Sequence, residues 1–315
     1  MSGGKTQIRT FRPTHIALGF VGRGDMHRCT TSSPRPSAIA SLFTVALAVS
    51  LLLAACDGSD DDESDGGGTA IEANPSDASI LSVDSTWQWQ LQGEVNTSYD
   101  VDVYDIDLFD TPAATVTELN AAGRVVVCYF SAGSYEAWRP DADRFSEADL
   151  GAPLDGFEEE RWLDIRSTTV RSVIEARLDR AAVLGCDGVE PDNVDGYLND
   201  SGFDLTADDQ LDFNRFIARA ARRRGLLVGL KNDLDQITEL VDEFDFAVNE
   251  QCHEFDECDL NRPFLDAGKP VFNAEYADEF VIDVESLCTT ATAEGLRTLV
   301  LPLDLDDSFR ITCDT

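Results

Sequence analysis

The stretch that most strongly indicates the fold reads Cys186-Asp-Gly-Val-Glu-Pro-Asp-Asn-Val-Asp-Gly-Tyr197. It begins as a short apolar strand and ends in three carboxylates and an amide. A second stretch, Phe244-Asp-Phe-Ala-Val-Asn-Glu250, has the same form and ends in an amide and an acid. Acidic residues at the carboxyl ends of separate strands are typical of β/α barrels, which assemble their active sites there.

Runs of β-branched and aromatic residues recur along the chain with helical stretches between them. Several of the helical stretches end in glycine, which is the usual stop before a following strand. This alternation predicts an α/β fold, a single-domain (β/α)8 TIM barrel, and a doubly wound sheet is the runner-up. A short additional strand is predicted at Leu163–Ile165. The eight expected strands are Trp87–Leu91, Val101–Leu108, Val125–Phe130, Cys186–Glu190, Leu226–Leu230, Asp245–Val248, Val271–Glu275 and Thr298–Leu301.

The N-terminus has the pattern of an export signal. Residues 38–55 form an uncharged apolar run that follows basic residues and ends in Leu53-Ala-Ala-Cys56. This ending resembles the bacterial lipobox, so we expect residues 1–55 to be removed and Cys56 to carry lipid. Met26 is a candidate for the true start. A transmembrane anchor is the alternative, but the run is barely long enough to span a bilayer. The protein is therefore expected to be exported and lipid-anchored to a bacterial membrane or cell surface.

An acidic, glycine-rich segment follows Cys56, and such a composition cannot bury a core. We therefore expect residues 56–81 to be a tether and residues 82–315 to be the barrel domain. Removing residues 1–55, which hold six basic residues and one acid, changes the net charge from −36 to −41. This charge argues against a nucleic acid partner, which needs a basic face. A cationic partner would be attracted, although acids spread for solubility are the simpler explanation.

Six cysteines remain between the expected lipid-bearing residue and the C-terminus. An exported protein is expected to form disulfides, and six cysteines allow 15 connectivities. Cys252 and Cys258 flank a short loop and are the favoured pair. Cys288 is expected to pair with Cys313, and Cys128 is expected to be a buried free thiol. A zinc site is the alternative, but the paired spacings it needs are absent.

Histidine is nearly absent, and beyond residue 55 it occurs only at His253. One histidine cannot supply a multi-histidine zinc site, and no nucleophile-elbow motif accompanies it. No glycine-rich phosphate loop is present either. We therefore expect no cofactor and no metal, and we expect carboxylates to carry any proton transfers.

The residues at the ends of the expected strands form the candidate site. Asp192 and Glu250 are the predicted catalytic pair, because each directly follows an apolar strand beside an asparagine. Several other candidates have structural alternatives: Glu190 could hold Lys231, and Asp195 could cap a helix. The predicted substrate-binding residues are Asp105, Asp107, Tyr129, Trp138, Arg139, Glu190, Asn193, Asp195, Lys231, Asn232, Asn249, Glu275 and Tyr276.

Seven segments together resemble glycoside hydrolase family 114, the endo-α-1,4-polygalactosaminidase-like barrels. The resemblance implies a β/α barrel that cleaves α-1,4-linked galactosamine-containing polysaccharide, with catalytic acids at Asp192 and Glu250. Glu190 and Asp195 are the alternatives to Asp192. The resembling segments are Trp87–Leu91, Tyr104–Asp107, Cys128–Asp141, Trp162–Arg166, Cys186–Asp195, Gly229–Asn232 and Asn249–Cys252.

The hypothesis that follows is a retaining glycosidase in which Asp192 is the nucleophile and Glu250 the general acid/base. A de-N-acetylated galactosamine polymer is a polycation, which an acidic cleft would attract. We expect a monomer. A non-catalytic polysaccharide-binding barrel lipoprotein is the main rival, and a calcium-dependent structural domain is the second.

Overall fold

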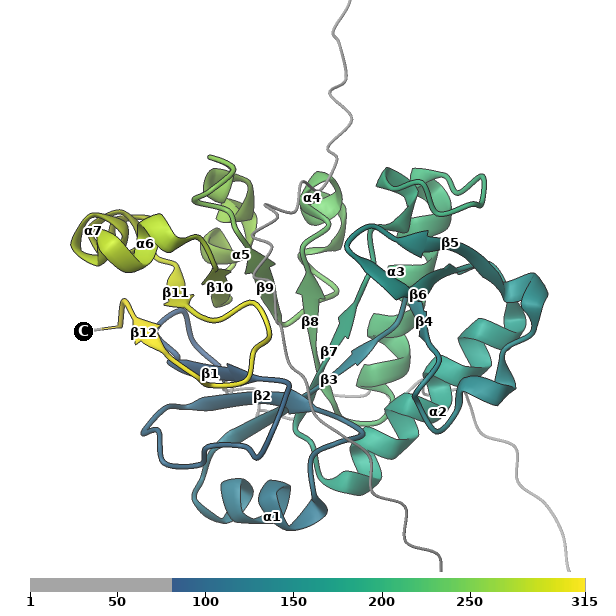
Figure 1. Cartoon of the computed structure of the whole chain (residues 1–315), viewed down its shortest axis with the longest axis horizontal. Helices are drawn as coiled ribbons and strands as arrows, with labels where there is room; N and C mark the ends of the chain where they lie inside the picture. Colours follow the sequence, from purple (N-terminus) through teal and green to yellow (C-terminus); the bar gives the residue numbers. More distant parts are fainter. Residues whose placement is uncertain (1–80, 315) are drawn as a thin grey trace, which may run out of the picture. The chain divides into compact units, whose positions relative to one another are not determined.

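The computed structural model describes residues 81–314, which form a curled sheet surrounded by helices (Figure 1). The sheet has the strand order β1-β2-β3-β7-β8-β9-β10-β11-β12. Neighbouring strands from β1 to β11 are parallel, and β12 pairs antiparallel with β11. The eight predicted parallel strands and the barrel architecture are thus confirmed. The strands span Trp87–Gln90, Val103–Asp107, Val125–Ser131, Gly188–Asp192, Leu227–Lys231, Phe246–Glu250, Val271–Glu275, Arg297–Val300 and Ile311–Thr312.

Helices lie around the outside of the curled sheet (Figure 1). The helix α3 begins with a capping box, in which Thr206 and Asp209 exchange side-chain and backbone hydrogen bonds. The helix α2 ends at Gly185, whose φ of 92° is readily adopted only by glycine. The α-helices α1 to α7 span Ala113–Ala121, Thr168–Leu184, Ala207–Arg222, Ile237–Leu240, Arg262–Asp266, Asp278–Ile282 and Val284–Glu294.

Aromatic side chains fill the interior of the curled sheet, because every second residue of a strand points inward. Trp87 and Trp89 stack with ring centroids 5.7 Å apart, and Trp87 also stacks on Phe272 at 5.0 Å. Phe246 occupies the space beside Gly229, where a Cβ atom would lie 2.4 Å from its ring. The polar residues at the strand ends therefore lie over a densely packed floor.

Side chains and loop hydrogen bonds join the first strand to the end of the chain. The Nε1 of Trp87 donates to the carbonyl of Arg297 at 2.8 Å, and Arg310 donates to the carbonyl of Trp87 at 2.8 Å. The backbone N–H of Leu91 donates to the carbonyl of Leu305 at 3.0 Å. These bonds close the seam that the strand pairing of residues 81–314 leaves between β1 and β11.

A three-stranded antiparallel sheet is inserted between β3 and α2. It has the order β4-β6-β5, with β4 at Ser134–Glu136, β5 at Leu150–Leu154 and β6 at Phe157–Leu163. The sequence predicted only a short strand at Leu163–Ile165, so this sheet was missed. The reason is composition: β5 contains glycine and proline, and β6 begins with three glutamates after its first residue.

The insert begins where the loops after β3 and β7 touch. A Cβ atom on Gly133 would lie 1.7 Å from the carbonyl oxygen of Asn193, so only glycine permits this contact. The backbone N–H groups of Ala132 and Gly133 donate to the carbonyl of Asp192 at 2.8 and 3.1 Å. The inserted sheet is therefore anchored directly beside the acidic end of β7.

Three disulfides are present in the described residues. The predicted pairs Cys252–Cys258 and Cys288–Cys313 are confirmed. The prediction that Cys128 is a free thiol was wrong, because Cys128 is bonded to Cys186. These two residues lie on or just before the neighbouring strands β3 and β7, which places their Cα atoms 6.0 Å apart.

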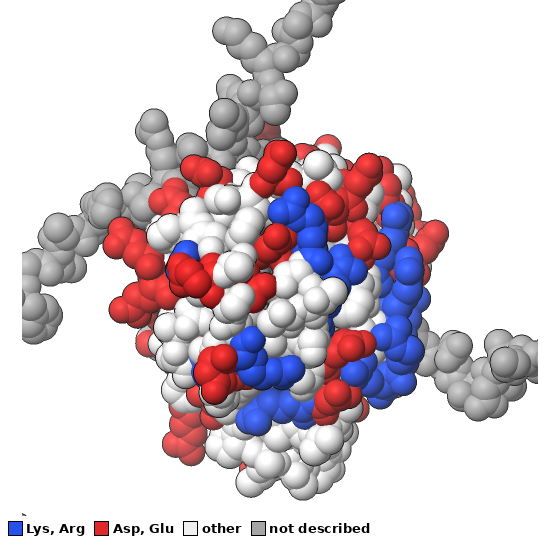
Figure 2. Space-filling view, turned by 90° about the vertical axis from the view of Figure 1, so that its right-hand side faces the viewer, with Lys and Arg blue, Asp and Glu red and all other residues white. Residues whose placement is uncertain are grey.

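Charged side chains of both signs are interspersed on the face that Figure 2 shows. Arg223 and Arg224, which directly follow α3, form ion pairs with α2, to Glu175 at 3.2 Å and to Asp179 at 2.7 Å. Such exposed pairs add little stability. Within residues 81–314, no helix combines the length and apolar character that crossing a bilayer would require.

We expect removal of the Cys128–Cys186 disulfide to destabilise the fold more than removal of Cys252–Cys258. The first bond closes a span of 58 residues and the second a span of 6, and longer loops lose more unfolded-state entropy. Paired alanine substitutions should lower the free energy of unfolding by about 4 and about 2 kcal/mol, respectively. Urea denaturation would measure both losses, and an equal or reversed order would contradict the expectation.

Candidate active site

A cavity of about 640 Å³ opens at the carboxyl ends of the strands. Four of its lining residues lie on neighbouring strands, with Asp192, Lys231 and Glu250 at the ends of β7, β8 and β9 and Tyr129 two residues before the end of β3. They occupy the inward-pointing positions of these strands, so parallel pairing brings them to one edge. The inserted sheet and the loops after β1 and β11 supply the remaining walls.

The ammonium group of Lys231 stands at the centre of the polar residues. Its Nζ lies 3.0 Å from Asp192, 3.0 Å from Glu250 and 3.5 Å from Glu190, and the side chain is only 3% exposed. It also lies 5.0 Å from the centroid of the Trp89 ring. Burial lowers the pKa of Lys231, but the surrounding carboxylates raise it, and the net pKa is well above the usual value. Lys231 is therefore a permanent cation at this site.

Asp192 accepts three hydrogen bonds that stabilise its negative charge. The hydroxyl of Tyr129 donates to Oδ2 at 3.0 Å, while Lys231 donates to Oδ1 at 3.0 Å. The backbone N–H of Asn193 donates to Oδ1 at 2.7 Å, and Asn193 has a positive φ of 59°. Charge-assisted bonds of this kind are the strong ones, so the Asp192 carboxylate is held in a fixed orientation.

Glu250 is oriented by a different set of donors. The Tyr276 hydroxyl donates to Oε1, and Lys231 contacts Oε2. Asn232 donates to Oε2 at 3.4 Å, and its own carbonyl oxygen accepts from the backbone of Glu250 and from Asn249, both at 3.0 Å. The Glu250 side chain is 25% exposed, against 17% for Asp192, so it is the more accessible of the two acids.

A second pair of acids lies beneath Lys231, inside the barrel. Asp105 and Glu190 are 1% and 0% exposed, and their carboxyl groups hydrogen-bond each other. Such a bond requires a proton on one of them. Burial raises the pKa of Asp105 to about 7 and the pKa of Glu190 well above its usual value. The Nε1 of Trp89 donates to Glu190 at 3.1 Å, which fixes the pair from the first strand.

A buried arginine organises the wall next to β2. Arg139 donates to Asp107 at 2.7 Å and to Glu136 at 2.8 Å, and all three are nearly inaccessible to solvent. Burial raises the pKa of Glu136 to about 7, although Arg139 and Arg177 oppose the rise. The carboxylates of this wall are therefore held beside a buried cation.

Large apolar side chains border the cavity at its rim. Trp138 is 53% exposed, Phe157 is 52% exposed and Leu303 is 65% exposed. Trp162, on β6 of the inserted sheet, lines the cavity deeper inside. Exposed aromatic rings beside polar groups suit the binding of a ligand that has both an apolar face and hydroxyl groups.

A model of the glycoside-hydrolase family GH114 matches residues 68–315. The chain belongs to family GH114. The GH114 assignment makes the chain a glycoside hydrolase, as the sequence resemblance predicted, and it accords with a barrel whose cavity is lined by paired acids. Among curated proteins, the comparison finds no match.

Ega3 and the glycoside hydrolase domain of PelA are among the solved structures that are similar to this GH114 chain. Ega3 of Aspergillus fumigatus, in a crystal structure with galactosamine, is 43% identical with a TM-score of 0.71 and covers 74% of this chain and 97% of its own. The glycoside hydrolase domain of PelA from Pseudomonas aeruginosa is 16% identical with a TM-score of 0.58. It covers 72% of this chain and 98% of its own, and at this identity it supports the fold alone.

Most residues predicted to bind substrate lie together in the cavity of the GH114 barrel. Asp105 and Glu190 instead lie under its floor, where Glu190 contacts Lys231 as the structural alternative proposed. Asn249 and Glu275 do not line the cavity. The predicted residues that do line it, besides Asp192 and Glu250, are Asp107, Tyr129, Trp138, Arg139, Asn193, Asp195, Lys231, Asn232 and Tyr276.

Asn249 and Glu275 support the site from outside it. Glu275 accepts from the backbone N–H of His253 at 2.9 Å and from the side chain of Asn273 at 3.0 Å. Asn249 accepts from Asn261 at 3.0 Å and holds the side chain of Asn232. Asn249 precedes Glu250 and Glu275 precedes Tyr276, and both of these following residues line the cavity. Because neighbours along a strand point to opposite faces, Asn249 and Glu275 point away from the cavity.

Sequence reasoning did not single out several lining residues. Glu160 and Trp162 belong to the inserted sheet, whose strands were not predicted. Trp89 follows the alternation of the first strand, because it lies two residues after the buried Trp87, and that signal could have identified it. The lining residues that were not predicted include Trp89, Leu91, Asp110, Leu154, Phe157, Glu160, Trp162 and Leu303.

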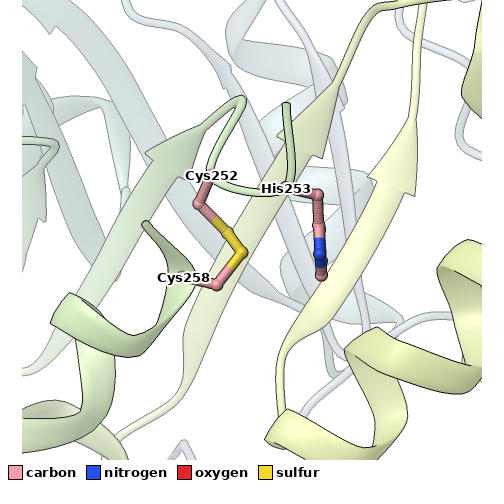
Figure 3. Close-up of side chains that lie close together, drawn as sticks. All are labelled: Cys252, His253 and Cys258. Carbon is pink, nitrogen blue, oxygen red and sulfur yellow. A yellow bond between two sulfur atoms is a disulfide. The ribbon is translucent and has the colours of Figure 1, made fainter. Parts of the chain in front are cut away.

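A cluster with metal-ligand chemistry lies beside the loop after β9. Cys252, His253 and Cys258 have ligand atoms within 4.8 Å of one another. Figure 3 shows that the two sulfur atoms are joined in a disulfide, so neither offers a thiolate. With one imidazole as the remaining donor, this cluster does not fit a zinc ion.

We expect Asp105→Asn to weaken the pH dependence of stability. Burial raises the pKa of Asp105 to about 7, so the folded state keeps a proton that the unfolded chain releases near pH 4. The resulting stabilisation is fully present below about pH 4 and is lost as the pH rises through about 7. The free energy of unfolding should therefore fall less between these values in the variant, as measured by urea denaturation.

The matched control is Glu118→Gln, on the exposed surface of α1. This control should show the same change in free energy with pH as the wild type. Indistinguishable slopes for Asp105→Asn and the wild type would contradict the inference that Asp105 is protonated in the folded state.

Proposed function

We propose that this protein hydrolyses α-1,4-linked galactosamine-containing polysaccharide, with Asp192 and Glu250 as its catalytic acids. The observation that carries the proposal is that both carboxylates contact the same ammonium group, Lys231, each at 3.0 Å, at the mouth of one cavity. Membership of family GH114 and the similarity to Ega3, crystallised with galactosamine, support the substrate class.

Asp192 is proposed as the nucleophile because its three donors hold the carboxylate in a fixed orientation. Its carboxylate attacks the anomeric carbon, and a glycosyl–enzyme ester forms as the bond to the leaving oxygen breaks. The contacts from Tyr129, Lys231 and the Asn193 backbone hold the attacking group still. Restricting the reacting group in this way removes much of the entropic part of the barrier.

Glu250 is proposed as the general acid and base. It donates a proton to the leaving oxygen in the first step, and in the second step it takes a proton from the water that attacks the anomeric carbon. That attack releases Asp192 and regenerates both groups. The greater exposure of Glu250 suits this role, because the group must meet both the leaving sugar and the incoming water.

The spacing of the two acids supports retention of anomeric configuration. One oxygen of each carboxyl lies 3.0 Å from the Nζ of Lys231, so these oxygens are no more than twice that distance apart. Retaining glycosidases have carboxyl groups about 5–5.5 Å apart, whereas inverting enzymes need about 6.5–9.5 Å to admit a water. The shared lysine thus holds the two acids close together, as the double-displacement route requires.

We expect Asp192→Asn and Glu250→Gln each to reduce polymer cleavage strongly. Removing a positioned acid or base typically costs about 10²–10⁴-fold in rate. The measurement is the appearance of new reducing ends from de-N-acetylated α-1,4-galactosamine polymer. Product configuration, followed by NMR during the first turnovers of the wild type, tests retention.

Asp200→Asn is the matched control for these variants. Asp200 is exposed and does not line the cavity. It lies in the segment that follows β7, the strand that ends at Asp192. Its cleavage rate should equal that of the wild type. Near-normal cleavage by either catalytic variant would end the assignment of that residue.

We expect cleavage of the polycationic substrate to slow as salt is added. The net charge of −36 attracts a polymer of ammonium groups, and salt screens that attraction over about 8 Å at physiological ionic strength. The value of kcat/KM should fall by about tenfold or more between low and moderate salt. The fully N-acetylated polymer is the neutral comparison, and an equal salt response for both substrates would contradict electrostatic attraction.

The proposal includes export and lipid attachment at Cys56, followed by an acidic tether. The support is the Leu53-Ala-Ala-Cys56 pattern and the composition after it. Residues 1–80 lie outside the described residues, so the lipid anchor, its membrane and the tether stay predictions. The expected monomeric state is a separate prediction.

A further inference from the structure

We propose that Glu160, on the inserted strand β6, recognises the ammonium group of a hexosamine unit in the substrate. This inference rests on the proposed function and adds to it a residue that distinguishes a free amine from an acetylated one. It depends on how the charges around the cavity are balanced and on how Glu160 is held.

Most buried or half-buried carboxylates of the cavity have a cation of the protein beside them. Arg139 pairs with Asp107 and Glu136, Arg177 also lies 3.7 Å from Glu136, and Lys231 stands between Asp192 and Glu250. Glu160 lines the same cavity, yet it forms no ion pair with any residue in the range 81–314. The inserted wall thus carries one enclosed carboxylate that no basic side chain of residues 81–314 contacts directly, although the charge of Arg139 acts on it from farther away.

The side chain of Glu160 is fixed by one oxygen only. The hydroxyl of Ser134 donates to Oε2 at 2.6 Å. Within residues 81–314, Oε1 accepts no hydrogen bond, and it is not among the atoms sealed from solvent. An oriented carboxylate with one free, accessible oxygen is a ready acceptor for a charged donor.

A chain of hydrogen bonds links Glu160 to the nucleophile proposed above. Ser134 contacts the hydroxyl of Ser131 at 2.5 Å, and Ser131 accepts from the side chain of Asn193 at 2.9 Å. The backbone N–H of Asn193 in turn donates to Asp192 at 2.7 Å. The acceptor on the inserted sheet is therefore held in a fixed position relative to the group that attacks the sugar.

Electrostatics favour an ammonium ligand over a neutral one at this position. Burial and the charge of Asp192 raise the pKa of Glu160, and the hydrogen bond from Ser134 and the charge of Arg139 oppose the rise without cancelling it, so its negative charge is destabilised in the cavity. A ligand cation would relieve the burial of an unpaired charge and the repulsion from Asp192 together. An N-acetyl group carries no charge and adds bulk, so it gains neither effect.

Asp195 is the other enclosed cavity carboxylate without a basic partner in the described residues. Burial raises the pKa of Asp195 to about 6, with Asp192 adding to the rise. No hydrogen bond from another residue orients its carboxylate within residues 81–314, whereas Ser134 orients Glu160. Glu160 is therefore the better placed of the two to select a ligand by geometry, and Asp195 serves as a comparison.

The test compares two substrates in Glu160→Gln: fully de-N-acetylated and fully N-acetylated α-1,4-galactosamine oligomers of equal length. We expect kcat/KM for the amine substrate to fall about ten- to hundredfold, the usual loss for a hydrogen bond to a charged group. The value for the acetylated substrate should change by less than about threefold, so the preference for the amine collapses. A general disturbance of the fold would lower both values and leave their ratio unchanged.

The matched control is Glu159→Gln. Glu159 is the preceding residue on β6, is exposed and does not line the cavity, so the same change of charge is made on the other side of the strand. Its substrate preference should equal that of the wild type. An unchanged preference in Glu160→Gln, or a collapse seen only in Asp195→Asn, would overturn the assignment to Glu160.

Cleavage of the two oligomers by the wild-type protein distinguishes a failure of the Glu160 inference from a failure of the proposed function. If the wild-type protein cleaves neither oligomer, both the proposed function and the role of Glu160 are overturned. If it cleaves the amine substrate and Glu160→Gln retains the wild-type preference, the proposed function stands and the role of Glu160 alone is overturned.

Discussion

The ammonium group of Lys231 determines the arrangement of the acids around it. Three carboxyl groups from β7 and β9 approach one cation, and the side chain of that cation is 3% exposed. Without it, like charges at this separation in a poorly hydrated space would repel strongly, and burying each would carry a large desolvation cost. Gly229, two residues earlier on the same strand, leaves room for the Phe246 ring, so the lysine stands over a filled interior.

The acids near the strand ends have three different kinds of partner. Some are paired with a buried cation, as Asp107 is with Arg139. The Asp105–Glu190 pair shares a proton inside the barrel, where a second negative charge would be costly. Within residues 81–314, Glu160 contacts neither a basic side chain nor a second carboxyl with which it could share a proton. The same residue type thus has different chemistry according to burial and neighbours, which composition alone does not show.

The barrel and the central acids follow from the sequence because the signals for them are local. Continuous apolar runs specify buried parallel strands, and residues that end such strands must meet at one edge, as Asp192 and Glu250 do. Other features depend on pairings that the chain makes only when folded. The bond between Cys128 and Cys186 requires β3 and β7 to be neighbours, although the insert and α2 separate them in sequence. The inserted sheet lacks alternating apolar residues, and so Glu160 had no pattern to mark it.

The Cys128–Cys186 bond encloses the entire insert and α2 in one covalent loop of the chain. Both ends of that loop are fixed to the adjacent barrel strands β3 and β7. The segment that shapes one side of the cavity is therefore anchored to the barrel at both ends, whatever contacts its own side chains make. Substitutions within the enclosed segment can therefore reshape the cavity wall while the barrel frame stays intact. Diversification of this enzyme toward other sugars would thus be structurally easiest between these two cysteines.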